Sequence, residues 1–365
     1  MSFASESSLP EPQDCSVLVT GGAGFIGSAV IRALVAKGYK AVINVDALTY
    51  AGNLLTLEKE CTYPGYQFEH ADICDRDQMR TIFDRYQPDA VMHLAAESHV
   101  DRSIDGPAQF IETNIKGTFN LLELVRELDA GRSTDALKTR FHHVSTDEVY
   151  GSLGADGYFL EDSRYQPNSP YSASKAASDH LVRAWGETFG LNIVVSNCSN
   201  NYGPYQYPEK LIPVVIHRAL NGDAIPVYGR GENIRDWLFV DDHAQALERV
   251  MRSGESGRTY NIGGDSEKTN LEVVEEICRI LDDLKPRPRG SHRDLIEFVT
   301  DRPGHDFRYA IDASRVKAEL GWTAQENFSS GIRKTIQWYL DNAHWVEAVG
   351  GSASAARRQG LRGAR

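Results

Sequence analysis

Two pairs of ionisable side chains carry the chemistry that this sequence suggests. Asp147 and Glu148 are adjacent, and Tyr171 and Lys175 stand four residues apart as Tyr-x-x-x-Lys. If the second segment is helical, Tyr171 and Lys175 lie on one face, where the ammonium can lower the pKa of the phenol. A tyrosinate base suits hydride transfer from an alcohol, whereas two neighbouring carboxyl groups suit acid/base removal of water from a sugar. The sequence therefore predicts an oxidation centre beside a dehydration centre.

A glycine-rich turn near the N-terminus predicts a dinucleotide site. Gly21, Gly24 and Gly27 follow the apolar run 17–20 and precede a helical pattern. Such glycines allow close backbone approach, and a helix N-terminus offers unpaired N–H groups to a pyrophosphate. Asp46 ends the next predicted strand, where a carboxylate accepts hydrogen bonds from a ribose diol and repels a 2′-phosphate. We therefore expect NAD rather than NADP.

The elements that must position these groups follow an α/β pattern. Short apolar runs alternate with amphipathic stretches, which predicts a doubly wound parallel sheet of the Rossmann type, followed by a smaller mixed α/β lobe that binds substrate. We expect residues 15–200 to bind the cofactor and carry the catalytic residues, residues 201–342 to form mainly the substrate lobe, and residues 1–14 and 343–365 to be disordered. The predicted strands are Ser16–Thr20, Ala41–Asp46, Gln67–Asp72, Ala90–Ala95, Phe141–Ser145 and Asn192–Ser196, then Pro226–Tyr228 and Trp237–Val240. The predicted helices are Phe25–Lys37, Arg76–Tyr86, Pro107–Leu128, Tyr171–Phe189, Asn270–Leu284 and Phe328–Asn342.

Composition excludes several classes of function. The net charge of −12 disfavours nucleic-acid binding, which usually needs a basic face. The 5 cysteines include no C-x-x-C pair and favour a reducing compartment. No segment has the pattern of a signal peptide or the ~18 apolar residues of a membrane span. We therefore expect a cytoplasmic protein that binds neither nucleic acid nor membrane, and no metal-ligand spacing predicts a metal site.

Several motifs carry a resemblance to known proteins. Through Thr20-Gly21-x-x-Gly24-x-x-Gly27 and Tyr171-x-x-x-Lys175, the chain resembles the extended short-chain dehydrogenase/reductase family. Segments 146–151, 196–204, 208–213 and 301–306 are similar to motifs of the dTDP-glucose 4,6-dehydratase family, and the resemblance covers roughly residues 17–340. It implies a tightly held NAD that is reduced and reoxidised within one turnover, a nucleotide-sugar substrate and a homodimer formed largely by helices.

The resemblance also implies a role for each catalytic residue. Tyr171 takes the proton of the sugar 4-hydroxyl, helped by Lys175 and Thr146, while hydride passes from C4 to NAD. Glu148 then removes the C5 proton, Asp147 donates a proton to the departing 6-hydroxyl, and hydride returns to C6. Two neighbouring carboxyl groups can keep one neutral and one charged. The residues alone leave open which is which, so the assignment of Asp147 as the acid comes from the resemblance.

Two sets of binding residues are implied in the same way. The cofactor set is Gly21, Gly24, Phe25, Ile26, Gly27, Asp46, Leu48, Thr49, Asp72, Ile73, Leu94, Ala95, Ala96, Ser98, Thr113, Tyr171, Lys175 and Asn201. The substrate set is Ser98, Thr146, Asn200, Lys210, Leu211, Pro226, Tyr228, Arg235, Asn270, Asp301, Arg302 and His305. Arg235 is the expected diphosphate ligand, because a guanidinium can meet phosphate oxygens with two bonds.

Alternative functions stay open at this point. A UDP-glucose 4,6-dehydratase would need to differ only in its recognition of one methyl group on the base. Nucleotide-sugar epimerases and decarboxylases share the glycine turn and the Tyr/Lys pair, but the position of Asp147 usually holds a residue that cannot donate a proton. A redox-sensing binding protein would keep the dinucleotide fold without needing four reactive groups. The dehydratase is therefore favoured, and its 4-keto-6-deoxyglucose product could feed rhamnose or other deoxysugar biosynthesis.

Overall fold

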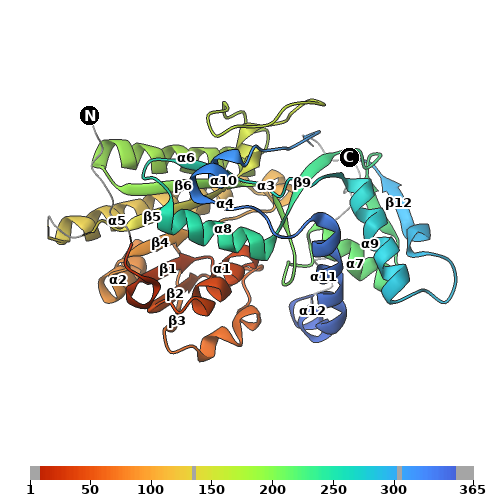
Figure 1. Ribbon diagram of the computed structural model, residues 1–365, viewed down its shortest axis with the longest axis horizontal. Coiled ribbons are helices and arrows are strands. Elements are labelled where there is room, and N and C mark those ends of the chain that lie inside the picture. The colour runs from red at the N-terminus through yellow and green to blue at the C-terminus, as the bar shows by residue number, and fades with distance from the viewer. Residues whose placement is uncertain (1–8, 134–136, 302–305, 351–365) are drawn as a thin grey trace.

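The computed structural model describes residues 9–133, 137–301 and 306–350. Its main element is a parallel seven-stranded sheet with the strand order β10-β6-β5-β4-β1-β2-β3 (Figure 1). The strands are β1 Ser16–Thr20, β2 Ala41–Asp46, β3 Tyr66–His70, β4 Ala90–His93, β5 Arg140–Thr146, β6 Asn192–Cys198 and β10 Thr259–Ile262. The predicted doubly wound parallel fold is confirmed.

Helices cover both faces of this sheet, so its strands are apolar on both sides. Val17 and Val19 of β1 pack with α1 (Phe25–Ala36) and α8 (Val240–Ser253) on one face. Leu18, which points the other way, packs with α2 (Arg76–Tyr86), α5 (Thr118–Gly131) and α6 (Pro170–Phe189) on the opposite face. This two-sided burial explains why the central strands β1 and β4 read as short apolar runs in the sequence.

The helix that bears the Tyr/Lys pair has strong start and stop signals. Ser169 and Ser172 form a reciprocal capping box at the start of α6, with Pro170 in the first turn. The helix ends at Gly190, whose φ of +67° is a left-handed conformation that glycine adopts without strain. Tyr171 and Lys175 therefore lie one turn apart on a well-defined helix, as predicted.

The predicted helix Pro107–Leu128 is interrupted. The structure has α4 (Pro107–Phe110), a wider π-helical turn η4 (Ile111–Gly117) and then α5. In the wide turn, Asn114 donates to the carbonyl of Glu97 at 3.0 Å and to Oγ of Ser174 at 2.8 Å. π-turns of this kind are common at functional sites. Here the turn ties the loop after β4 to helix α6.

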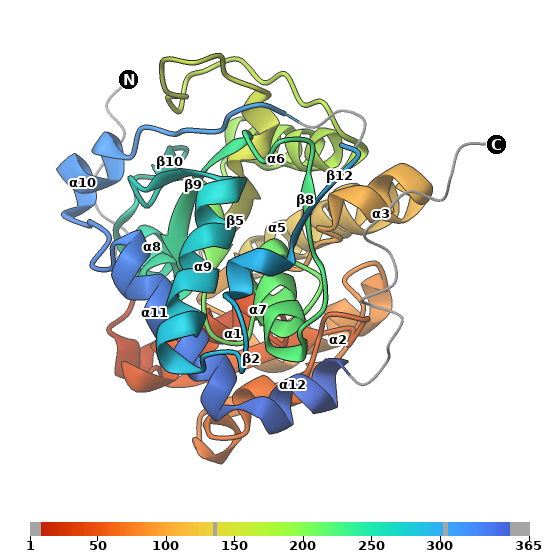
Figure 2. The same cartoon turned by 90° about the vertical axis from the view of Figure 1, so that its right-hand side faces the viewer.

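A smaller lobe lies to the right of the sheet in Figure 1, and its helices α7, α9 and α11 face the viewer in Figure 2. Its core contains Ile212, Val215, Val273, Ile277 and Ile332. Two small sheets belong to it, with the orders β11-β9-β7 and β12-β8. The remaining elements are α3 Val100–Asp105, β7 Asn200–Tyr202, α7 Leu211–Asn221, β8 Ile225–Tyr228, β9 Ile234–Phe239, β11 Glu267–Thr269, α9 Asn270–Leu284, β12 Ile296–Val299, α10 Ser314–Leu320, α11 Phe328–Asp341 and α12 Ala343–Gly350, with the short turns η1 Pro12–Asp14, η2 Leu54–Leu57, η3 Glu60–Thr62, η5 Asp147–Tyr150 and η6 His292–Leu295.

The chain returns to the large sheet after residue 200. Helix α8 packs on α1, and β10 adds the seventh strand beside β6. The predicted boundary at residue 200 therefore does not coincide with the edge of the large sheet.

The predicted disorder of residues 1–14 and 343–365 is wrong for the parts that the structure describes. Helix α12 spans Ala343–Gly350, and its Trp345 is buried against the rings of Trp338 and Tyr205, with centroid distances of 5.2 and 5.5 Å. Near the N-terminus, Leu9 is buried and Arg252 donates to the carbonyl of Pro10 at 3.0 Å. Burial of large apolar side chains orders both segments. Residues 1–8 and 351–365 lie outside the described residues.

Candidate active site

A cavity of about 350 Å³ opens at the carboxyl ends of the parallel strands. The strand order reverses between β1 and β4, which is the position where open α/β sheets bind their ligands. Its walls come from the turn after β1, from the ends of β2 to β6 in the large sheet, from α6 and from the segment 198–210. Both ionisable pairs and the glycine turn therefore meet in one cavity.

The glycines are required by close packing around the turn. Gly21 has a φ of +72°, and a Cβ there would lie 2.7 Å from the backbone of Ala95. A Cβ on Gly27 would lie 2.1 Å from the carbonyl oxygen of Gly21. Gly24 is the N-cap of α1 and makes no side-chain capping bond, so the helix N-terminus faces the cavity uncapped by a side chain. This is the arrangement that receives a pyrophosphate.

Asp46 is held in place by the backbone. Its two carboxylate oxygens accept from the N–H of Leu48 at 2.8 Å and from the N–H of Ala23 at 2.9 Å. Burial raises the pKa of Asp46, and these two bonds oppose the rise. Leu48, which the sequence predicted as a cofactor contact, does not line the cavity and instead orients Asp46 through its backbone. The other predicted cofactor residues all line the cavity.

The five predicted catalytic residues come together in this cavity, from the end of β5, from η5 and from α6. Asp147 is only 2% exposed. Burial raises its pKa well above the usual range, and the neighbouring charges of Glu148 and Asp236 add to the rise. Its Oδ1 accepts from Thr146 at 3.4 Å, while Oδ2 has no hydrogen-bond partner among the described residues. Asp147 therefore favours the protonated form that a general acid needs.

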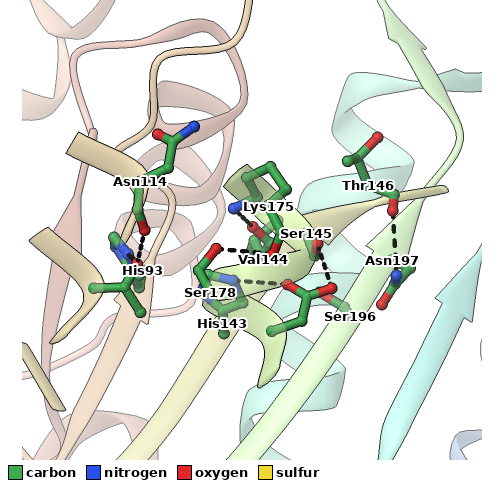
Figure 3. Close-up of polar contacts among 12 residues, drawn as sticks. His93, Asn114, His143, Val144, Ser145, Thr146, Lys175, Ser178, Ser196 and Asn197 are labelled. Carbon is green, nitrogen blue, oxygen red and sulfur yellow. Dashed lines mark hydrogen bonds and ion pairs between the residues drawn. The ribbon is translucent and has the colours of Figure 1, made fainter. Parts of the chain in front are cut away.

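Tyr171 departs from the sequence prediction in one respect. Burial raises its pKa well above the usual range, and the charge of Glu148 raises it further, while a hydrogen bond with Thr146 opposes the rise. The ammonium of Lys175 donates to the carbonyl of Val144 at 2.9 Å (Figure 3). The expected lowering of the Tyr171 pKa by Lys175 is therefore wrong for the cavity as the structure shows it, because burial dominates.

Three loops that are distant in sequence meet over the cavity. Arg102 lies 3.6 Å from the ring centroid of Tyr50, and that ring meets Tyr207 edge-on at 5.7 Å. Lys210 donates to the carbonyl of Ser98 at 3.3 Å. The sequence analysis missed cavity residues on these loops, on α4 and at the ends of β5 and β6, among them Tyr50, Ala51, Gly52, Gln109, Val144, Ser145, Cys198, Ser199, Gln206, Tyr207 and Glu209. Proximity to Asp46 or Lys210 along the chain was the available signal for Tyr50, Tyr207 and Glu209.

The predicted substrate residues fall into two groups. Ser98, Thr146, Asn200 and Lys210 line the cavity. The others do not line it and belong to the lobe: Leu211, Pro226, Tyr228, Arg235, Asn270 and Asp301. Arg302 and His305 lie outside the described residues.

Arg235 sits close to the acid of the catalytic pair. Its buried guanidinium donates to the carbonyls of Ile234 at 2.7 Å and Asp306 at 3.0 Å, and it lies 4.3 Å from the ring centroid of Tyr309. Its charge lowers the pKa of Asp147 and so partly offsets the effect of burial. Contact with a diphosphate stays a prediction for this residue.

Neither a membrane-spanning helix nor a metal-binding cluster occurs among the described residues. No helix in that part of the chain is long and apolar enough to cross a membrane. The same residues contain no group of three or more His, Cys, Asp or Glu side chains placed to hold a metal ion.

Comparison with known proteins identifies the family. The family profile described as GDP-mannose 4,6 dehydratase matches residues 18–335. The chain is 59% identical over 343 residues to the dTDP-glucose 4,6-dehydratase of Shigella flexneri, covering 91% of this chain and 95% of the relative. It is 59% identical over 338 residues to that of Neisseria meningitidis serogroup B, with the same coverages of 91% and 95%. Among solved structures, the dTDP-glucose 4,6-dehydratase of Streptomyces venezuelae with NAD and TYD bound matches with a TM-score of 0.83 and 43% identity, covering 92% of this chain and 99% of that one. Together with the cavity geometry, these matches show that the chain belongs to the dTDP-glucose 4,6-dehydratase family.

Proposed function

We propose that this protein catalyses the NAD-dependent dehydration of dTDP-glucose to dTDP-4-keto-6-deoxyglucose. The observation that carries the proposal is the buried, proton-favouring Asp147 beside Glu148 and Tyr171, in the same cavity as the glycine turn. An alcohol oxidation needs only the tyrosine and lysine, whereas loss of water also needs an acid at this position.

The residues present fit NAD. Gly21 and Gly27 have no room for a Cβ, the uncapped start of α1 suits a pyrophosphate, and Asp46 presents a carboxylate for a ribose diol. NAD bound by these residues would supply the hydride acceptor for the first step and the hydride donor for the last. The two transfers cancel over one turnover, so the reaction consumes no cofactor.

The chain's own residues divide the acid/base work among them. Tyr171, hydrogen-bonded to Thr146, takes the proton of the sugar 4-hydroxyl. The ketone at C4 acidifies the C5 proton, which Glu148 removes; the protonated Glu148 returns a proton to C5 when C6 receives hydride. Asp147 then donates its proton to the departing 6-hydroxyl, and its Oδ2, which has no partner among the described residues, is the atom available for this donation. Burial favours the protonated form of Asp147, which its role as general acid requires.

The substrate assignment rests on the family. The relatives named above act on dTDP-glucose, and the Streptomyces structure contains TYD as well as NAD. Ser98, Asn200 and Lys210 provide polar groups at the cavity wall for the sugar, and Arg235 provides a cation beyond it for the diphosphate.

Incubation with dTDP-glucose and mass analysis tests the proposal. The expected result is loss of one water from the sugar without added nicotinamide, with UDP-glucose run beside it as the competing substrate. A product of unchanged mass would indicate an epimerase instead, and an unchanged sugar would indicate a binding protein. Tyr171→Phe provides the matched inactive control.

We further propose a homodimer joined through helices and located in the cytoplasm. Exposed apolar side chains gather on η4, α5 and α6, where Ile111 is 51%, Phe119 37% and Phe189 47% exposed. Such a surface favours association. All five cysteines are free, which suits a reducing compartment. Light scattering of the purified protein tests the dimer, and Ile111→Asp should yield monomers if this surface forms it.

A further inference from the structure

A buried carboxylate that the proposed reaction does not use lies one helical turn beyond Lys175. Asp179 of α6 is 5% exposed. Its Oδ1 accepts from Nε2 of His143 at 3.0 Å, and its Oδ2 accepts from the hydroxyls of Ser145 and Tyr165, both at 2.9 Å. Three uncharged donors therefore orient this carboxylate without neutralising it.

The Lys175 ammonium is the cation that this charge can balance. Lys175 is 4% exposed, and the hydrogen bond that it donates goes to a neutral carbonyl, that of Val144. A buried ammonium is strongly destabilised unless an anion lies nearby. Among the groups that interact with its charge are Asp179 on its own helix, His143 on β5, His93 on β4 and Cys198 on β6.

Of these four groups, Asp179 is the one that can carry a negative charge at neutral pH. Burial lowers the pKa of both His143 and His93 well below the usual range, so both imidazoles are neutral. Burial raises the pKa of the Cys198 thiol to about 12, so it is neutral as well. Among these four groups, removal of Asp179 would therefore leave no negative charge to balance the Lys175 ammonium.

Asp179 also fixes the strand end that carries a catalytic hydroxyl. His143 and Ser145 both belong to β5, and the next residue is Thr146. The carbonyl of Thr146 accepts from Asn197 of β6 at 3.2 Å (Figure 3). Asp179 thus ties α6, with Tyr171 and Lys175, to the end of β5.

We propose that Asp179 is a positioning residue for the oxidation step: it keeps Lys175 charged and holds helix α6 against the end of β5. The inference rests on the proposed function, because Lys175 has its role only if Tyr171 acts as the base in the oxidation of an alcohol. It adds a residue that acts through Lys175 and does not touch the substrate.

The charge state of Asp179 makes the idea testable by pH. Burial raises its pKa to about 6, and the charge of Lys175 is the strongest opposing influence. The groups that face it are Lys175 and His180 on α6, His143 and Ser145 on β5, Tyr150 on η5, and Tyr165 on the segment before α6. As the pH falls through about 6, the carboxylate gains a proton and stops balancing Lys175.

Asp179→Asn keeps the shape of the side chain and removes its charge. We expect the single-turnover rate of sugar oxidation, followed by the absorbance of the reduced nicotinamide, to fall on the order of 10- to 100-fold. We also expect the alkaline limb of its pH profile to move to lower pH, because Lys175 loses its proton sooner without the anion. Glu187→Gln, an exposed carboxylate on the same helix, is the matched control and should leave the profile unchanged.

The inference is overturned if the alkaline limb of Asp179→Asn lies at the same pH as that of the wild type. A rate that falls equally at every pH would not rescue it, because loss of a purely structural contact would also lower the rate in that way. If this variant does not fold, Tyr165→Phe removes one hydrogen bond that favours the ionised carboxylate and should move the acid limb to higher pH. An unmoved acid limb would also overturn the inference. Failure of the proposed function is distinguishable, because the wild-type protein would then show no reduced nicotinamide with dTDP-glucose.

Discussion

Replacement of Asp147 by asparagine should change how the stability of the protein depends on pH. Asp147 is buried and its pKa lies well above the ordinary value of 3.8. Above about pH 4 the unfolded chain releases this proton while the folded protein keeps it, so rising pH favours unfolding by about 1.4 kcal/mol for each pH unit up to the folded pKa. Asparagine ionises in neither state. The free energy of unfolding of the variant should therefore lack this dependence on pH. Relative to the wild type, the variant should become more stable as the pH rises above 4.

The absolute offset between the two proteins has a second source. The amide nitrogen replaces Oδ2, which has no partner among the described residues, and carries one hydrogen more than the protonated acid, so the additional unpaired N–H destabilises the variant by about 1–3 kcal/mol. This cost does not vary with pH, because the amide does not titrate. Urea unfolding between pH 4 and 8 separates the constant offset from the slope, and the slope is the quantity that tests the protonation of Asp147.

The same substitution should slow one chemical step. In deuterated water, Asp147→Asn should still oxidise C4 and exchange the C5 proton, but loss of water should fall on the order of 10²- to 10⁴-fold, the usual contribution of a general acid. Glu148→Gln is the matched comparison, since it should oxidise C4 yet lose exchange at C5. Absorbance of the reduced nicotinamide, deuterium at C5 and loss of water give three separate readouts.

Two outcomes would refute this reasoning about Asp147. Water loss at the wild-type rate in Asp147→Asn would place the general acid elsewhere. A pH slope equal to that of the wild type would mean that the folded protein holds Asp147 ionised.

The remaining predictions concern the base, the cofactor turn and the last helix. Tyr171→Phe should lose oxidation of C4 by roughly 10²- to 10⁴-fold, and an undiminished signal of reduced nicotinamide on mixing would move the base to another residue. Wild-type protein should release NAD on heating, whereas Gly27→Ala should purify with less, because the new Cβ meets the Gly21 carbonyl at 2.1 Å; equal absorbance of the two supernatants would contradict this. Trp345→Ala should lower the free energy of unfolding by about 3 kcal/mol, and an unchanged urea midpoint would mean that α12 does not dock.

Much of the large sheet could be predicted because its strands are buried on both faces. That burial produces continuous apolar runs such as 17–19 and 90–92, which stand out in the sequence. The seventh strand β10 was missed because it has only four residues and two of them, Thr259 and Asn261, are polar. Asn261 is satisfied by Phe159 and Tyr150, whose bonds with it measure 3.0 and 2.9 Å. No local pattern reveals such distant partners.

In the candidate site too, residues in local sequence motifs could be predicted, whereas contacts between distant segments could not. Gly21, Asp147 and Tyr171 belong to short motifs whose residue types and spacing indicate their chemistry, and all three residues line the cavity. The contact of Tyr50 with Tyr207 joins two loops that are far apart in the chain, so it depends on the folded topology. The pKa of Tyr171 was misjudged for a related reason: the spacing places Lys175 nearby but does not reveal how completely the phenol is buried.

The return of the chain to the large sheet determines how the protein can be divided in an expression experiment. A fragment that ends at residue 200 would lack β10, so β6 would become an open edge strand with unpaired backbone groups. It would also lack α8, which leaves the apolar face of α1 around Val30, Ile31 and Leu34 exposed to water. Open edges and bare apolar faces both promote aggregation. Residues 15–200 are therefore not expected to fold as an independent domain, and an expressed fragment should extend at least through Ile262.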